Sequence, residues 1–115
     1  MIYFDQDGVL VSYDKEIYNG DNPIWLKKNE HIFLKQKADE KMKTVFNEMY
    51  KFLGEYVCVL TAVQNFDVVL KNEHIIDKWQ WMLREYPEFD MCNFITCDSS
   101  KMQAISKIKG TSLSK

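Results

Sequence analysis

The sequence has little cysteine, little excess charge and no long apolar run, and each of these absences narrows the class of protein. Its three cysteines, Cys58, Cys92 and Cys97, are an odd number at spacings unlike those of metal-binding pairs. We therefore expect reduced, buried thiols in a cytoplasmic protein. The formal net charge of −2 gives no reason to expect a nucleic acid polymer as partner. No apolar stretch approaches the roughly 20 residues of a membrane span, so we expect no membrane segment.

What the chain does contain predicts one soluble domain built of strands and helices. Its 115 residues are 46% hydrophobic and 28% charged, and no internal repeat or low-complexity segment is present. Apolar residues at 1–5, 56–61 and 92–97 predict three strands. The second is a near-continuous apolar run, which is typical of a strand covered on both faces.

Three further segments predict helices. Residues 36–53 carry an apolar stripe that Gly54 ends. A second helix of about 20 residues ends before Pro87. A last helix is expected to begin near Ser99 or Ser100 and to end before Gly110. The apolar positions expected to recur along the second helix are Val69, Ile75, Ile76, Trp79, Met82, Leu83 and Tyr86.

Strands that alternate with helices predict a single α/β domain over residues 1–115, with a Rossmann-like three-layer α/β/α parallel sheet. In such sheets the ligand crevice lies beyond the carboxyl ends of the strands. This would gather Asp5, Asp7, Thr61 and the Ser99-Ser100-Lys101 turn at one edge. Residues 12–35 differ, because they mix turn residues, charges and aromatics. We expect them to form a small cap insertion that folds over the crevice.

The first predicted strand ends in two carboxylates, Asp5 and Asp7, followed at once by Gly8. In an extended chain, side chains two residues apart point the same way, and glycine permits a sharp turn close to a ligand. Two converging carboxylates suit a hard cation such as Mg²⁺, with phosphate as its companion. Taken alone, the motif is also compatible with a plain turn after a strand.

Several segments resemble one enzyme family. The segment Phe4-Asp5-Gln6-Asp7-Gly8-Val9-Leu10 closely resembles motif I of the haloacid dehalogenase-like (HAD) phosphohydrolases. Val59-Leu60-Thr61-Ala62 resembles motif II, and Lys101 resembles the motif III lysine. The motif sequences Asp-x-Asp-Gly-Val-Leu and Leu-Thr-Ala are most similar to those of the 5'(3')-deoxyribonucleotidase branch. Lys78-Trp79-Gln80-Trp81 is a loose match to a further Lys-x-x-Trp element of that branch. The resemblance covers the chain outside residues 12–35.

This resemblance implies an Mg²⁺-dependent phosphate monoester hydrolase that works through an aspartyl-phosphate. Asp5 would be the nucleophile, and Asp7 the general acid and then the general base. The Asp5 carboxylate and the Asp7 backbone carbonyl would hold Mg²⁺. The Thr61 hydroxyl, the Ala62 N–H and the Lys101 ammonium would bind the phosphate, with Lys101 also balancing the charge on Asp5. The implied substrate is a small phosphorylated molecule of the nucleoside monophosphate class.

The sequence departs from the family at Gln6, where motif I more often has an apolar residue, and more seriously after Lys101. The fourth motif, an apolar strand that ends in paired acids, does not follow Lys101. The first strand would then lack a neighbour, and a homo-oligomer contact, a partner chain or a missing tail would cover its edge. Two explanations stay open: a C-terminally truncated chain, or a degenerate member that serves as a binding or assembly module. We expect His31 and His74, which lack ligand-spaced partners, to be structural or surface residues.

Overall fold

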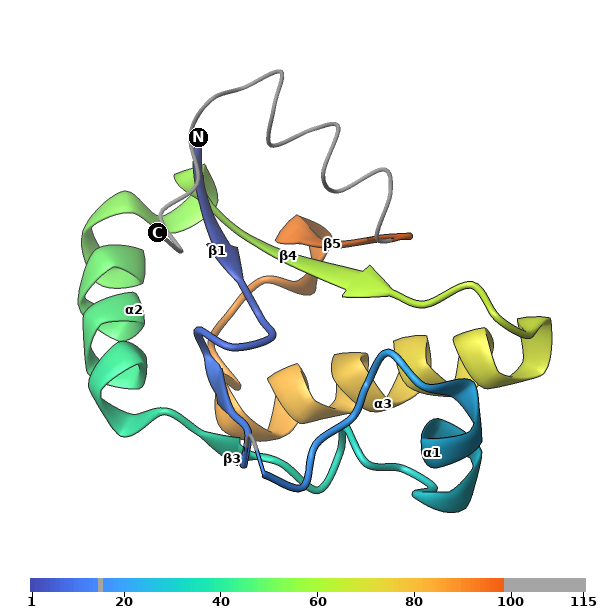
Figure 1. The fold of residues 1–115 in the computed structure, drawn as a ribbon. Coiled ribbons are helices and arrows are strands. Elements are labelled where there is room, and N and C mark those ends of the chain that lie inside the picture. Colours follow the sequence, from blue (N-terminus) through green and yellow to red (C-terminus); the bar gives the residue numbers. More distant parts are fainter. Residues whose placement is uncertain (15, 99–115) are drawn as a thin grey trace.

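The computed structural model describes residues 1–14 and 16–98, and three of its strands form a parallel sheet in the order β1-β4-β5 (Figure 1). These strands are β1 (Ile2–Asp5), β4 (Val57–Val63) and β5 (Phe94–Asp98). β1 and β5 both pair with β4, so the carboxyl ends of neighbouring strands meet at one edge. The coarse prediction of a Rossmann-like α/β domain is confirmed, and each predicted strand is found within two residues of its expected ends.

The helix predicted over residues 36–53 begins later than expected. Lys37–Ala38 forms a short strand, β3, that pairs antiparallel with β2 (Val11–Ser12). α2 then runs over Glu40–Leu53, because the Asp39 side chain accepts a hydrogen bond from the backbone N–H of Met42 and caps the helix. Gly54, with a φ of 48°, ends α2 as predicted.

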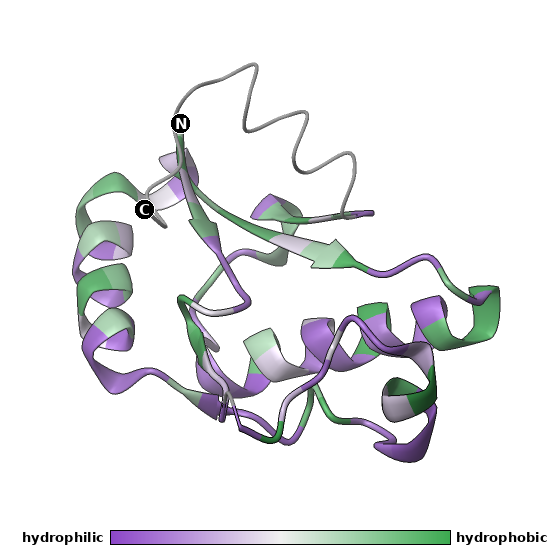
Figure 2. Ribbon diagram, in the orientation of Figure 1, coloured by the Kyte–Doolittle hydropathy of each residue, from purple (hydrophilic) through white to green (hydrophobic). Residues whose placement is uncertain are grey.

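The prediction for the second helix is right in extent and right about the burial of Met82 and Tyr86, but it is wrong for four other predicted core positions. α3 runs over Val68–Glu85 and is capped by Asp67. Its predicted core positions Val69, Ile76, Trp79 and Leu83 are instead between 41% and 76% exposed. The residues that α3 buries are His74, Asp77, Lys78, Trp81 and Met82. Figure 2 shows hydrophilic and hydrophobic segments alternating along α3, so hydropathy alone did not define its inner face.

The hydrophobic core lies between the sheet and the helices α2 and α3. Phe46 of α2 is at its centre and packs edge-on against Phe4, Tyr86 and Phe89. A sheet and one helical layer are therefore present in the part of the chain that the structure describes. The predicted third layer, the helix from Ser99 or Ser100, lies outside the described residues.

The segment between β2 and β3 contains α1 (Pro23–Lys28), which Asn22 caps, and this segment lies beside α3 (Figure 1). Hydrogen bonds tie it to α3: Trp81 Nε1 donates to the carbonyl of Gln36, Arg84 donates to the carbonyls of Leu34 and Gln36, and His31 bonds Asp77. The predicted insertion thus sits against the buried face of α3, next to the carboxyl end of the sheet.

Among the cysteines, Cys58 is buried, Cys97 is partly buried and Cys92 is exposed, so the prediction of three buried thiols is wrong for Cys92. Cys92 lies in the short 3₁₀ turn Met91–Asn93 before β5, where its own backbone N–H bonds the Asp90 side chain. No helix in the described ranges is long and apolar enough to cross a bilayer.

Candidate functional site

The Asp7 carboxylate is the centre of a polar cluster at the carboxyl ends of β1 and β4. Its Oδ2 lies 2.6 Å from Lys78 Nζ and 3.2 Å from the Thr61 hydroxyl, which donates to it. Its Oδ1 accepts a hydrogen bond from the Tyr13 hydroxyl at 2.5 Å. Lys78 Nζ also donates to Thr61 Oγ1 at 3.1 Å and to the carbonyl of Ala62 at 2.7 Å. The structure therefore brings Asp7, Thr61 and Ala62 together around an ammonium group.

The local backbone explains why Asp7 reaches this cluster. The β1–β4 pairing extends one residue past β1, since the Gln6 N–H donates to the carbonyl of Leu60. The chain then turns at Gly8, whose φ of 78° suits glycine and strains other residues. The turn closes when the Val11 N–H donates back to the carbonyl of Gln6. Asp7 is therefore held on a tight turn rather than on an extended strand.

Lys78 is a member of the Asp7 cluster that the sequence did not predict as a site residue. Its side chain, 2% exposed at the residue level, crosses from α3 to the sheet, and its ammonium lies 4.3 Å from the centre of the Phe33 ring. Because a buried cation requires polar partners, the oxygens of Asp7, Thr61 and Ala62 stabilise it there. The buried Gln6 side chain also fixes this turn of α3, by donating to the Lys78 carbonyl at 3.0 Å. Lys101, which was predicted to supply the ammonium, lies outside the described residues.

Asp5 is not part of the Asp7 cluster. It is the last residue of β1, is partly exposed, and pairs in register with Leu60. The preceding residue, Phe4, points into the core, and strand alternation therefore directs Asp5 away from α2 and α3. Within the described ranges the Asp5 carboxylate makes no side-chain hydrogen bond or ion pair. The side-chain partners of Asp7 are Tyr13, Thr61 and Lys78, and Asp5 contacts none of them through a hydrogen bond or ion pair in the described part of the chain.

The residues present fit Mg²⁺ at Asp5 better than at the Asp7 carboxylate. The Asp7 carboxylate already carries an ammonium at 2.6 Å, which would repel a second cation on the same oxygens. The Asp5 carboxylate and the Asp7 backbone carbonyl are hard oxygen donors of the kind that Mg²⁺ prefers. The donor chemistry thus agrees with Asp7 as a carbonyl ligand and not as a carboxylate ligand.

A small cavity of about 180 Å³ adjoins the cluster. Residues of the insertion, β4 and α3 line it together with Asp7: Tyr18, Gly20, Asp21, Phe33, Ala62, Val63, Gln64, His74 and Lys78. The ring of Tyr18 stacks on that of Tyr13 with centroids 4.1 Å apart. Burial, and then the charge of Asp7, raise the pKa of Tyr13, so its hydroxyl stays a hydrogen-bond donor to Asp7.

His74 lies on this cavity, where the sequence predicted a structural or surface residue. Its side chain is buried, and its ring packs edge-on against Phe33 with centroids 4.8 Å apart. Burial, followed by the nearby Lys78 ammonium, lowers the pKa of His74. The imidazole is therefore neutral near pH 7.

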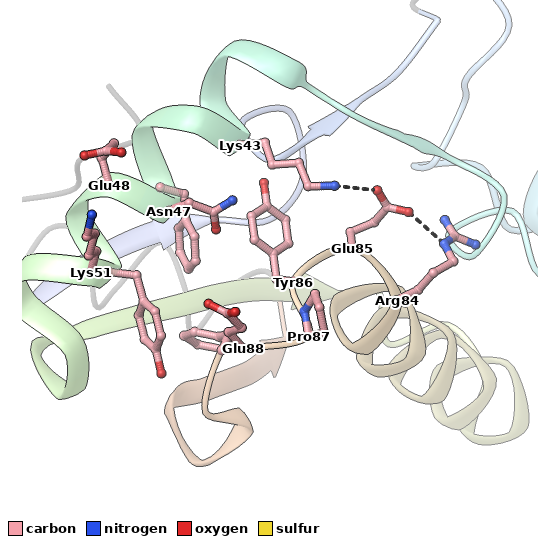
Figure 3. A pocket seen from close by; sticks show the side chains of 12 residues that line it. Lys43, Asn47, Glu48, Lys51, Arg84, Glu85, Tyr86, Pro87 and Glu88 are labelled. Carbon is pink, nitrogen blue, oxygen red and sulfur yellow. Dashed lines mark hydrogen bonds and ion pairs between the residues drawn. The ribbon is translucent and has the colours of Figure 1, made fainter.

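A larger hollow of about 860 Å³ lies between α2 and the end of α3 (Figure 3). Its charged side chains are partly paired with one another, since Glu85 bonds both Lys43 and Arg84. No residue of the Asp7 cluster lines it. Size alone would favour this hollow, but the convergent polar groups favour the smaller cavity.

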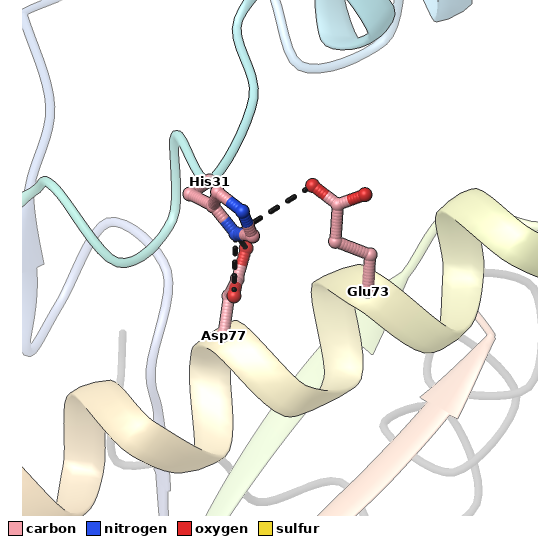
Figure 4. A group of neighbouring side chains, drawn as sticks. All are labelled: His31, Glu73 and Asp77. Atoms are coloured by element: carbon pink, nitrogen blue, oxygen red, sulfur yellow. Dashed lines mark hydrogen bonds and ion pairs between the residues drawn. The ribbon is translucent and has the colours of Figure 1, made fainter.

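His31, Glu73 and Asp77 form a second cluster, on the insertion and α3 (Figure 4). His31 Nδ1 lies 3.0 Å from both oxygens of Asp77 and 3.6 Å from Glu73. The hydrogen bond to Asp77 and its charge raise the pKa of His31. These are metal-ligating residue types, but the buried Asp77 already has His31 as its hydrogen-bond partner, and this contact between the insertion and α3 accounts for the cluster. The sequence showed no partner for His31 because its partners lie on a distant helix.

Comparison with known proteins adds no assignment: no protein-family model, curated protein or solved structure matches the chain. The case for a function therefore depends on the residues and their arrangement.

Proposed function

We propose that the protein is an Mg²⁺-dependent phosphate monoester hydrolase of the HAD-like kind, acting through an aspartyl-phosphate on Asp5. The observation that supports this most is the Asp7 cluster. A carboxylate, the Thr61 hydroxyl and the Lys78 ammonium converge at the carboxyl ends of two adjacent parallel strands. This is the part of an α/β sheet at which ligands bind, and the hydroxyl and the ammonium are donors of the kind that a phosphate dianion requires.

In the proposed reaction, the Asp5 side chain, which does not line the cavity in this structure, turns toward a phosphate held by Thr61 and Lys78. One of its oxygens then attacks phosphorus as the bond to the leaving oxygen breaks. The leaving oxygen takes a proton from Asp7. Water then attacks the aspartyl-phosphate and gives a proton to Asp7, which releases phosphate and restores both carboxyl groups. In the structure Asp7 accepts hydrogen bonds from Tyr13, Thr61 and Lys78, so at least one of these donors has to release it during the cycle.

The remaining groups would bind Mg²⁺ and the phosphate and would offset the negative charge of the phosphate. Asp5 and the Asp7 backbone carbonyl would hold Mg²⁺, which when bound offsets the repulsion between a carboxylate and an anionic phosphate. Thr61 and Lys78 would donate to the phosphate oxygens. Lys78 would then take the part that the family resemblance gives to Lys101. Its position over Phe33 and beside Asp7 supports this assignment.

The cavity limits the substrate class. About 180 Å³ bounded by Tyr18, Phe33 and His74 suits a small leaving group rather than a polymer. We therefore propose a small phosphate monoester, such as a nucleoside monophosphate, as the substrate.

One observation favours a second candidate function, a HAD-derived binding or assembly module. The Lys78 ammonium already saturates the Asp7 carboxylate, which leaves the proposed acid and base engaged in a static ion pair. In that case the cluster would hold an anion or stabilise the fold without turnover.

An assay of phosphate release distinguishes the two functions. The substrates are p-nitrophenyl phosphate and deoxynucleoside monophosphates, each tested with Mg²⁺ and with a chelator. The variant Asp5→Asn removes the nucleophile, and Asp14→Asn, at an exposed loop acid, is the matched control. Hydrolysis requires turnover that depends on Mg²⁺, disappears in Asp5→Asn and persists in Asp14→Asn. Turnover absent in the unmodified chain, or unchanged in Asp5→Asn, would contradict the hydrolase and favour the module.

A further inference from the structure

Gln6 and Asp7, two consecutive residues of the turn after β1, hold one residue of α3 in two different ways. The Gln6 side chain donates from Nε2 to the backbone carbonyl of Lys78 at 3.0 Å. The Asp7 carboxylate lies 2.6 Å from the ammonium of the same lysine. The Gln6 backbone is itself fixed to β4, because its N–H donates to the Leu60 carbonyl at 2.8 Å. The backbone of Lys78 is therefore tied to the sheet independently of its ammonium.

The environment of the Gln6 amide is unfavourable for stability. The residue is 1% exposed, and its Oε1 has no hydrogen-bond partner in the part of the chain that the structure describes. A buried acceptor without a partner destabilises a fold. The Lys78 carbonyl does not need Gln6 either, because in an α-helix it accepts from the Met82 N–H four residues later. Stability alone would therefore favour an apolar side chain at this position, as the family resemblance also leads us to expect.

The proposed reaction gives the Gln6 contact a role. Asp7 acts there as general acid and base, and it can do so only after at least one of its three donors, Tyr13, Thr61 and Lys78, has released it. A phosphate would attract Lys78 most strongly, since it is the cation among the three. When its ammonium moves from Asp7 to the phosphate, the ion pair no longer connects Asp7 with α3. The bond from Gln6 to the backbone does not depend on the ammonium and persists.

We infer that Gln6 is a positioning residue, which keeps Lys78 at the phosphate site while the ammonium is released from Asp7. This inference rests on the proposed function for the movement of the ammonium. It explains why a buried amide with an unpaired oxygen lies between the sheet and α3. Because a displacement of about 1 Å can lower a rate about a hundredfold, a fixed backbone at Lys78 matters for the reaction.

The kinetic test compares Gln6→Met with Gln80→Met, a control at an exposed glutamine of α3. Methionine has a similar length and no amide, so it removes the contact and still fills the space. We expect kcat for p-nitrophenyl phosphate to fall about tenfold in Gln6→Met and to stay unchanged in Gln80→Met. KM should change less than about threefold, because Thr61 still binds the phosphate of the substrate.

Stability distinguishes positioning from a merely structural role. The urea midpoint of Gln6→Met should equal or exceed that of the unmodified protein, because the unpaired Oε1 is gone and the Lys78 carbonyl keeps its partner in the helix. A structural role predicts instead that the midpoint falls together with kcat. A lower midpoint in Gln6→Met, or an unchanged kcat, would overturn the inference.

A second test measures the hold on α3 without turnover. Amide hydrogen exchange of Met82 reports on the Lys78 carbonyl to which this amide donates, and exchange of Phe46 in α2 is the reference. A global loss of stability accelerates both amides alike, so the ratio of the two rates reports on the local hold. Asp7→Asn weakens the ion pair, as release of the ammonium would, and Gln6→Met removes the other contact. Each alone should raise the ratio less than about threefold, and both together more than about tenfold.

The two tests separate this inference from the proposed function. Turnover that depends on Asp5 but not on Gln6 would retain the hydrolase and overturn the inference. An exchange ratio that rises in the double variant of a chain without turnover would confirm the hold of Gln6 on Lys78, but it would contradict the hydrolase and with it the positioning role. A ratio that stays unchanged in the double variant would overturn the inference whatever the turnover.

Discussion

The two sides of α3 differ less than those of an ordinary amphipathic helix, because its buried side carries polar residues beside Trp81 and Met82. The side that faces the sheet and the insertion buries His74, Asp77 and Lys78. The outer side exposes Ile76 and Leu83. Helices normally bury apolar residues. Part of the inner side of α3 instead buries polar residues, which form the candidate site. Where α3 buries the polar residues His74 and Lys78 in place of apolar ones, its side chains belong to the Asp7 cluster and line the adjoining cavity.

The largest expected effect concerns two tryptophans of α3. Trp81 is fully buried at 0% exposure and donates to the Gln36 carbonyl, whereas Trp79 is 41% exposed. Trp81→Ala should lower the free energy of unfolding by about 3–5 kcal/mol, and Trp79→Ala by about 1 kcal/mol or less. Urea unfolding followed by circular dichroism measures both. Equal losses would show that the two sides of α3 are not distinguished as described.

The next effect concerns the polar part of the inner side. Lys78→Met leaves the Asp7 carboxylate without its cation, although Tyr13 and Thr61 still donate to it. We expect a loss of about 1–3 kcal/mol in the free energy of unfolding, because Asp7 is partly exposed. Phosphate hydrolysis should be lost as well. Lys71→Met, two turns earlier on α3, should stay within about 0.5 kcal/mol, and a similar loss in both variants would argue against a specific role for Lys78.

The smallest effect is the opposite pH dependence of the two histidines. The pKa of His31 is raised, so its contribution to stability is complete below its ordinary value of 6.5 and is lost as the pH rises through the folded-state pKa. The pKa of His74 is lowered, so its contribution is present above 6.5 and is lost as the pH falls. His31→Gln should therefore be less stable than the unmodified protein mainly at acidic pH.

His74→Gln should gain stability relative to the unmodified protein as the pH falls from about 8.5 to about 5.5. Urea midpoints across this range measure both variants. The same direction for the two histidines would contradict the environments described here.

The sequence predicted the strands and the site edge well, and it failed where side chains from distant elements meet. Apolar runs were enough to find β1, β4 and β5, since buried strands need little else. Asp7 and Thr61 were predicted because both follow such runs. The inner side of α3 was predicted only in part, because periodicity assigns apolar residues to the core, whereas Lys78 is buried by its partners in β4 and the turn after β1. α2 begins later than its apolar stripe predicted, because the hydrogen bond from the Met42 N–H to the Asp39 side chain fixes where the helix starts.

The most direct test of the account is a double-mutant cycle between Lys78 and Asp7, with Lys78→Met, Asp7→Asn and the double variant compared by urea unfolding. The 2.6 Å contact between Lys78 Nζ and Asp7 Oδ2 predicts a coupling of about 1–3 kcal/mol, so that the second substitution costs much less once the first is present. Strictly additive losses, with a coupling within about 0.3 kcal/mol of zero, would contradict the cluster on which the proposed site depends.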